Sequence, residues 1–220
     1  MDINQAIKER HSVRKYLDKP IEEELRNKLN ELVDEINKES GLHVQLICDE
    51  PGCFNSFLAH YGRFSDVKNY IALVGKESDD KLEEKCGYFG QKIVLEAQMM
   101  GLRTCWVGGT FSKGKCKAKT DDGEKHVLVI TIGYGAEEGK AHKSKRQEQI
   151  CDVPAADMPE WFKKGLEAAM LAPTAINQQK FNISLKGEDV IVTAGKGPFS
   201  VTDLGIVKYN FEAASGHKCL

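Results

Sequence analysis

Two arginines and a serine lie close together near the start of the chain, in the segment Arg10-His11-Ser12-Val13-Arg14. A guanidinium group presents a planar fork of N–H donors that matches a phosphate, and a serine hydroxyl adds one more donor. The segment therefore predicts a phosphate-binding turn. The alternative is a solvent-exposed basic turn without a ligand, and composition alone favours that alternative.

A second candidate segment reads Ala-Pro-Thr-Ala-Ile-Asn-Gln-Gln at residues 172–179. Pro173 must end the preceding helix, and the small residues Thr174 and Ala175 let the backbone approach a ligand closely. The carboxamides of Asn177 and Gln179 can both donate and accept, which suits the edge of a heterocycle or a polyol chain. The alternative is a polar turn whose side chains satisfy its own backbone.

A third segment ends in paired glycines, Gly108 and Gly109, after the sequence Gly-Leu-Arg-Thr-Cys-Trp-Val at residues 101–107. Glycines at the end of a strand leave their backbone N–H groups open to a flat ligand. A tight turn uses paired glycines equally well.

Regular elements must position these segments. Apolar stripes at helical spacing and alternating apolar runs predict five helices and six strands. We expect Asp157 to cap the fourth helix, with Glu160 completing a capping box. The expected helices span 2–10, 21–36, 82–100, 157–171 and 202–215, and the expected strands span 43–48, 70–74, 104–107, 126–134, 181–185 and 190–193.

The order helix, strand, strand, helix occurs twice, before and after a polar and basic stretch. We therefore expect a first half at residues 1–140, a basic linker at 141–152 and a second half at 153–220.

Composition excludes several classes. The net charge of −2 and pI of about 6.3 give no electrostatic case for a nucleic acid or an anionic membrane as a partner. No apolar run is long enough to span a bilayer, and the start does not resemble a signal peptide. The seven cysteines lack a Cys-x-x-Cys pair, so we expect free thiols in a reducing cytoplasm and no metal site.

Together the three segments resemble the FMN-dependent nitroreductase family. That family has Arg-x-Ser-x-Arg or Lys after a first helix, Ala-Pro-Ser-x-x-Asn-x-Gln-Pro-Trp after a second, and Gly-Leu-x-Thr-x-Trp-x-Gly-Gly after a later one. The resemblance covers most of the chain. It implies an α+β fold of two related α/β halves, with central, mostly antiparallel sheets flanked by helices.

The resemblance also implies roles for the matching residues. Phosphate ligands would come from the first motif and from two lysines after the last strand of the first half. Contacts with the flavin ring and the ribityl chain of FMN would come from the other two motifs. The implied cofactor-binding residues are Arg10, His11, Ser12, Arg14, Gly108, Gly109, Lys143, Lys145, Pro173, Thr174, Ala175, Asn177 and Gln179.

The chain departs from the common family pattern in two places. The Pro-x-x-x-Asn-x-Gln motif follows the arginine motif only in the second half of the chain, and Lys180-Phe181 stand where the family often has Pro-Trp. Ordinary members are homodimers with flavins between subunits. The separated motifs therefore resemble the fused, tandem branch, in which a monomer imitates the dimer and holds one FMN.

The implied activity is hydride transfer from NADH or NADPH through FMN to a small organic acceptor such as a nitroaromatic or a quinone. The cofactor supplies this chemistry, so no catalytic side chain is identified. A non-catalytic FMN-binding carrier or sensor is the alternative function. The aromatic stretch 54–64 could be a lid over the site or ordinary packing.

Overall fold

The computed structural model describes residues 1–55 and 61–220. The chain forms two compact units, and neither is contiguous in the sequence. The sheet unit comprises residues 10–82 and 93–141, and the helical unit comprises residues 1–9, 83–92 and 142–220. Helix α4 (Leu82–Met99) contributes residues to both. The two units are defined by packing contacts, which do not show whether residues 1–140 and 153–220 are related to each other. The expected internal repeat therefore stays a prediction.

The sheet unit is built on four antiparallel strands in the order β1-β2-β4-β3. Their bounds are Gln45–Ile47 for β1, Tyr70–Lys76 for β2, Arg103–Val107 for β3 and Glu124–Gly133 for β4. Six of seven residues of β2 and seven of ten residues of β4 are buried, which agrees with the apolar runs in their sequences. The expected antiparallel α+β architecture is confirmed.

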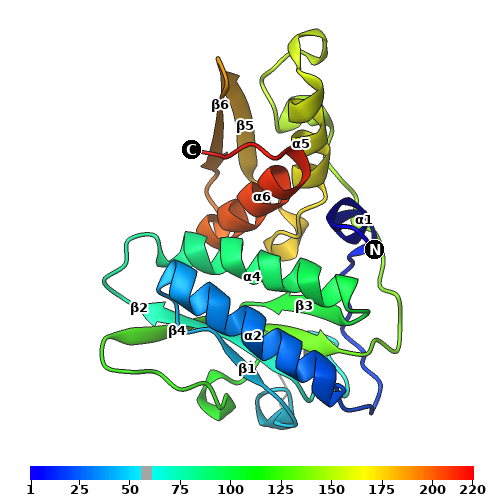
Figure 1. Ribbon diagram of the computed structural model, residues 1–220, viewed down its shortest axis with the longest axis vertical. Coiled ribbons are helices and arrows are strands. Elements are labelled where there is room, and N and C mark those ends of the chain that lie inside the picture. Colours follow the sequence, from blue (N-terminus) through cyan, green and yellow to red (C-terminus); the bar gives the residue numbers. More distant parts are fainter. Residues whose placement is uncertain (56–60) are drawn as a thin grey trace. The chain divides into compact units, whose positions relative to one another are not determined.

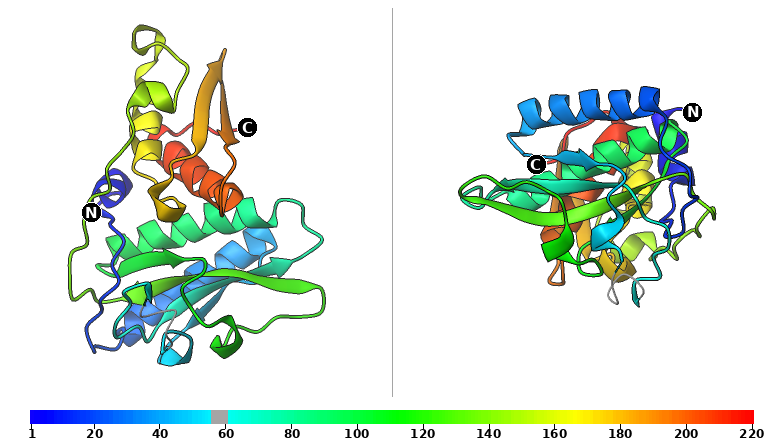
Figure 2. Two further views of the ribbon diagram at one scale, coloured as in Figure 1. Left: turned by 180° about the vertical axis from the view of Figure 1, so that it is seen from behind. Right: turned by 90° about the horizontal axis from the view of Figure 1, so that it is seen from below.

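Helix α2 (Glu23–Ser40) covers one face of this sheet (Figures 1 and 2). Its apolar stripe buries Leu29, Val33 and Ile36. Gly41 ends the helix with φ 71°, a left-handed conformation that glycine adopts without steric cost.

An aromatic cluster fills the sheet unit near β2. The Phe54 ring lies 5.4 Å from Phe64, 6.0 Å from Tyr70 and 6.3 Å from Phe111. The two ends of the stretch considered as a lid are therefore core, whereas Tyr61 is 79% exposed. Residues 56–60, including Phe57, lie outside the described residues.

The helical unit contains α1 (Ile3–Glu9), α5 (Glu160–Met170), α6 (Ser200–Ser215) and the hairpin of β5 (Phe181–Lys186) and β6 (Asp189–Ala194). The expected capping role of Asp157 is wrong, because α5 begins after Pro159 without a side-chain cap. Asp157 instead ends a short 3-10 turn (Ala155–Asp157). Pro159 already presets the backbone φ of the helix entry and removes one N–H that would need a cap.

Helices α4 and α6 touch backbone to backbone within the helical unit. A methyl group at Gly205 would lie 2.6 Å from the backbone N of Tyr88 and closer still to the carbonyl O of Glu84. A methyl group at Gly87 would lie 3.1 Å from the backbone N of Ile206. These two glycines therefore set how closely the helices approach.

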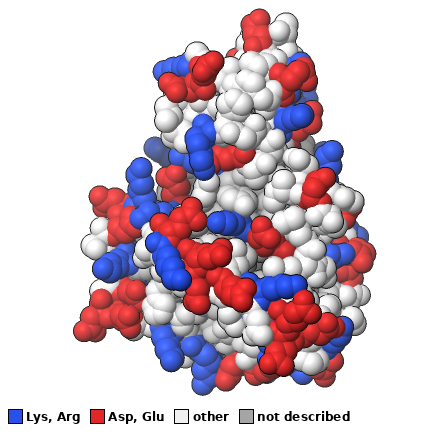
Figure 3. All heavy atoms as spheres, in the orientation of Figure 1, with Lys and Arg blue, Asp and Glu red and all other residues white. Residues whose placement is uncertain are grey.

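Acidic and basic side chains are interspersed on the face shown in Figure 3, as the nearly balanced composition predicts. Within the described part of the chain, no helix combines the length and the apolar character needed to cross a membrane.

Candidate functional site

The arginine motif runs alongside β3 in the sheet unit. The backbone N–H of Val13 donates to Thr104 O at 3.0 Å, and Ser12 pairs with Thr104 as an isolated parallel bridge. Further along, the buried Tyr16 hydroxyl donates to Val13 O at 2.8 Å and hydrogen-bonds to Thr131 Oγ1 at 2.7 Å. Strand β3 and the adjacent β4 thus fix the backbone of the motif.

Arg10 is a buried cation, only 5% exposed. Its guanidinium makes no hydrogen bond or ion pair with any residue that the structure describes, although Cys105 lies close enough to interact electrostatically. Burial lowers the pKa of Arg10 to about 10. A buried charge without a counter-ion is costly. A dianionic phosphate is a ligand that offsets this cost, so the residue fits the phosphate of FMN.

The other residues of the motif lie beside Arg10 on the same segment. The Ser12 side chain lies close enough to the buried thiol of Cys105 to lower its pKa against the larger opposing effect of burial. Arg14 is exposed, and its charge acts on the same thiol. His11 is half-buried next to Gly139, where a methyl group would meet its Cβ at 2.9 Å. The structure thus places two cationic groups and a hydroxyl together.

Gly108 and Gly109 follow directly after β3. A methyl group added at Gly109 would meet no atom within 4 Å, so its backbone is open to a ligand. Ser12 pairs with Thr104, four residues before Gly108, which corresponds to about 13 Å along a strand. A ligand that contacts both places must therefore be extended, with its phosphate at one end.

Four expected cofactor ligands come together in the helical unit. The Gln179 amide donates to Lys143 O at 3.0 Å and to Asn177 Oδ1 at 3.0 Å, and its oxygen accepts from Lys145 N at 2.8 Å. Asn177 Nδ2 also donates to Lys143 O, at 3.1 Å. Lys145 Nζ donates to Gln179 O at 2.8 Å. The basic stretch after residue 141 is therefore held against the Asn-Gln motif.

The turn formed by this motif is strained. Ile176, Asn177 and Gln179 have φ values of 49°, 55° and 46°, a region that residues with a side chain seldom occupy. Ile176 is 87% exposed. Gln179 is buried, and Thr174 Oγ1 accepts from its backbone N–H at 3.0 Å. The side-chain amide of Gln179 thus bonds both to Asn177 within the turn and to Lys143 and Lys145 outside it.

Asp203, on α6, shapes the same turn, and the sequence analysis did not single it out. Its carboxylate accepts from Ala175 N at 3.0 Å and from Gln178 Nε2 at 2.7 Å. Burial raises the pKa of Asp203 to about 6, although both hydrogen bonds favour the charged form. Its only sequence signal is an acidic residue in the first turn of α6.

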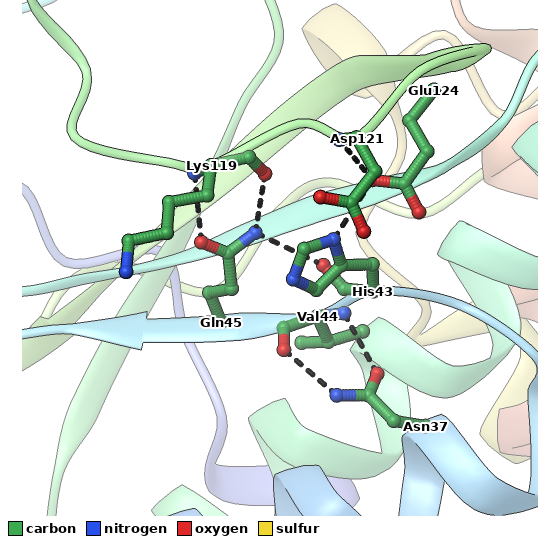
Figure 4. Close-up of polar contacts among 7 residues, drawn as sticks. All are labelled: Asn37, His43, Val44, Gln45, Lys119, Asp121 and Glu124. Carbon is green, nitrogen blue, oxygen red and sulfur yellow. Dashed lines mark hydrogen bonds and ion pairs between the residues drawn. The ribbon is translucent and has the colours of Figure 1, made fainter.

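A separate polar cluster joins the residues before β1 to the residues before β4 (Figure 4). His43, Asp121 and Glu124 each place one potential metal-ligand atom within 4.8 Å of the others. His43 Nδ1 lies 2.8 Å from Glu124 Oε2, and Asp121 N donates to the same oxygen at 2.9 Å. Asn37 holds the neighbouring Val44 backbone with two further hydrogen bonds. Within this cluster, the His43 and Glu124 side chains thus pair directly with each other.

Comparisons with known proteins identify the family. The family model described as "Putative TM nitroreductase" matches residues 2–215. A "putative nitroreductase" structure from Thermotoga maritima has a TM-score of 0.71 at 23% identity and covers 97% of this chain and 83% of its own. Another, from Desulfovibrio desulfuricans and solved in complex with FMN, has a TM-score of 0.53 at 20% identity, with 69% and 96% covered.

A third structure, described as a "putative NADH dehydrogenase/NAD(P)H nitroreductase" from Parabacteroides distasonis, has a TM-score of 0.51 at 19% identity and covers 67% of this chain and 95% of its own. No curated protein matches the chain. At these identities the structures establish the fold, whereas the family model spans nearly the whole sequence. The chain therefore belongs to the nitroreductase family that this model describes, a family of oxidoreductases.

Proposed function

We propose that the chain binds one FMN and passes hydride from NADH or NADPH to a small organic acceptor such as a nitroaromatic or a quinone. Family membership supports the oxidoreductase class, and the D. desulfuricans structure in complex with FMN supports the cofactor. We also propose a cytoplasmic location, as expected from the seven cysteines without a Cys-x-x-Cys pair.

The single observation that carries the cofactor proposal is the buried guanidinium of Arg10, which has no counter-ion among residues 1–55 and 61–220. Arg10, His11 and Ser12 would hold the FMN phosphate, and a phosphate would convert a costly buried charge into charge-assisted hydrogen bonds. Arg14 would carry positive charge to the phosphate or to the pyrimidine edge of the ring. The open backbone at Gly109 and the preceding Gly108 would donate to the other polar atoms of the ring.

The helical unit would supply the remaining ligands. We propose that Pro173, Thr174 and Ala175 line the ring or the ribityl chain, and that Asn177 hydrogen-bonds to it. Among the other ligands proposed from the helical unit, Gln179 hydrogen-bonds to the backbone carbonyl of Lys143 and to both nitrogens of Lys145. We therefore propose that these three act chiefly by shaping the turn that carries Asn177.

When bound, FMN supplies the two-electron chemistry, and the chain supplies binding, orientation and charge. Arg14 would favour the anionic reduced ring. The motifs of one chain would thus replace those that ordinary relatives take from two chains, as in the fused branch of the family.

The first test is the Arg10→Met variant. The pKa of Arg10 falls from 12.5 to about 10 on burial, so the charged side chain costs the free protein up to about 3 kcal/mol. Arg10→Met should therefore raise the free energy of unfolding of the FMN-free protein. It should also weaken FMN binding about 10- to 100-fold through lost charge-assisted hydrogen bonds. Flavin fluorescence titration measures the affinity, and urea denaturation measures the stability.

Arg26→Met is the matched control. Arg26 is an arginine of the same unit that pairs with Asp49 at 2.9 Å, outside the proposed site. This variant should bind FMN as the wild type does. Equal FMN affinity in Arg10→Met and wild type would refute the phosphate assignment.

Asn177→Ala tests the ligands proposed from the helical unit, with Asn182→Ala in the β5 strand as its control. We expect only Asn177→Ala to weaken FMN binding. If Arg10 and not Asn177 affects the affinity, one flavin does not take ligands from both motifs. A flavin-containing protein whose visible absorption NADH and NADPH cannot bleach would be a carrier or sensor rather than a reductase.

A further inference from the structure

Two cysteines far apart in the sequence meet in the sheet unit. Cys53 ends the short 3-10 turn η1 (Pro51–Cys53), and Cys116 follows the 3-10 turn η2 (Lys113–Lys115). Cys53 O accepts a hydrogen bond from Ser112 N at 2.8 Å, which ties the two turns together. Cys116 packs against the hydrophobic cluster that contains Cys53, and the two thiols interact electrostatically. The structure therefore presents a preformed dithiol.

The two members of this pair differ in access. Cys53 is fully buried in the aromatic cluster, whereas Cys116 is only partly buried. An oxidant from solvent therefore reaches Cys116 first, and the Cys53 thiol lies next to it. The access of the two thiols therefore suits Cys116 as the attacking thiol and Cys53 as the resolving thiol.

The surroundings of Cys116 stabilise its thiolate. Its sulfur interacts with the Cys53 thiol, the His126 side chain, the backbone N–H of Ala118 and the Tyr70 hydroxyl. These hydrogen bonds, that from Cys53 above all, lower the pKa of Cys116 below its ordinary value against the opposing effect of burial. The same interaction raises the pKa of Cys53.

The second nitrogen of His126 adds a further polar group at this position. The imidazole is buried, and its Nε2 has no hydrogen-bond partner among residues 1–55 and 61–220. The Tyr70 hydroxyl is oriented by the N–H of Lys117, which donates to it at 2.9 Å. An unpaired buried polar atom costs free energy, so its presence beside a thiol calls for a functional reason.

We propose that Cys116 and Cys53 form a peroxide-sensitive pair, in which hydrogen peroxide oxidises Cys116 and the pair then closes to a disulfide. The Cys116 thiolate attacks one oxygen of the peroxide, so that the S–O bond forms, the O–O bond breaks and the hydroxide released is protonated to water. The Cys53 sulfur then attacks the sulfenic sulfur and loses its proton. The S–S bond forms, and hydroxide leaves with that proton as water.

The balance is one peroxide and two thiols to one disulfide and two waters. The sulfur pair loses two electrons, and the peroxide gains them. Both cysteines lie on short turns outside the strands, so closing the bond displaces connecting segments rather than the sheet.

The test treats the full chain with stoichiometric hydrogen peroxide and counts free thiols under denaturing conditions. We expect the count to fall from seven to five, with a Cys53–Cys116 disulfide in the peptide map. Cys53→Ser should trap a sulfenic acid at Cys116, which dimedone labels, and Cys116→Ser should leave Cys53 unoxidised. Cys48→Ser, a control at another partly buried cysteine of the same unit, should form the disulfide as the wild type does.

A second measurement avoids variants that fail to fold. Alkylation of the wild type by iodoacetamide should modify Cys116 about tenfold faster than Cys48 at about pH 6, because only a thiolate reacts. Seven thiols surviving peroxide, a disulfide between other cysteines, or equal alkylation of Cys48 and Cys116 would each overturn the proposal.

Discussion

The close crossing of α4 and α6 makes Gly205→Ala a sharp test of the helical unit. The added methyl group would lie 2.6 Å from the backbone N of Tyr88, whereas ordinary contacts begin at 3.4 Å, so the helices must separate by at least 0.8 Å (3.4 minus 2.6). Both obstructing atoms belong to the backbone, and no side-chain rotation relieves the clash. Overpacking of this kind costs about 3 kcal/mol, and the better helix propensity of alanine returns about 1 kcal/mol.

Separation of the helices would also weaken two polar contacts at the crossing. Gln91 Nε2 donates to Asn210 Oδ1 at 2.9 Å in the buried interface, and Lys208 pairs with Glu84 at 2.7 Å. Together these terms predict a net loss of about 2 to 3 kcal/mol in the free energy of unfolding of the helical unit.

The positions of the two tryptophans allow this loss of stability to be assigned to the helical unit. Trp161 lies on α5 in the helical unit, and Trp106 lies on β3 in the sheet unit. In a Trp106→Phe background, urea unfolding followed by fluorescence reports on Trp161 alone. Gly114→Ala is the control, because a methyl group there meets no atom within 4 Å. If Gly205→Ala is as stable as Gly114→Ala, the helices do not approach through Gly205 and the reasoning fails.

Two further predictions concern buried polar groups. The pKa of Asp203 is 3.8 in the unfolded chain and about 6 in the folded protein. Protonation of Asp203 therefore stabilises the fold fully below about pH 4. Up to about 3 kcal/mol of this stabilisation is lost as the pH rises through 6. Asp203→Asn should remove that loss in urea titrations at pH 5 and 7, and an unchanged pH dependence would contradict the pKa assignment. Tyr16→Phe removes the buried hydrogen bonds of this hydroxyl to Val13 O and Thr131 Oγ1 and should cost about 1 to 2 kcal/mol by urea denaturation; a neutral change would contradict this contribution.

Local patterns predicted most of the regular elements. The apolar stripe of α2 and the glycine that ends it lie where the sequence placed them, because both depend only on neighbouring residues. The alternation before residue 48 and the run from residue 126 likewise became β1 and β4. The cap at Asp157 failed, because Pro159 provided a competing local start for α5.

Contacts between distant segments could not be predicted in this way. The hydrogen bonds of Gln179 come from Lys143 and Lys145, 34 to 36 residues away, so the sequence left open whether its amide faced a ligand or its own turn. The pairing of Cys53 with Cys116 likewise depends on two turns meeting across the aromatic cluster. Spacing rules for metal or disulfide motifs carry no information about such pairs.

The discontinuous units have a consequence for folding during synthesis. Helix α1 is made among the first residues, yet the helices with which it packs, α5 and α6, begin at residues 160 and 200. The segment 83–92 likewise packs with parts of the helical unit that are translated only after residue 141. The sheet unit, in contrast, is fully translated once residue 141 has been made. The sheet unit can therefore fold on the ribosome while the helical unit remains incomplete, and long-range contacts of this kind make the last step slow and exposed to aggregation.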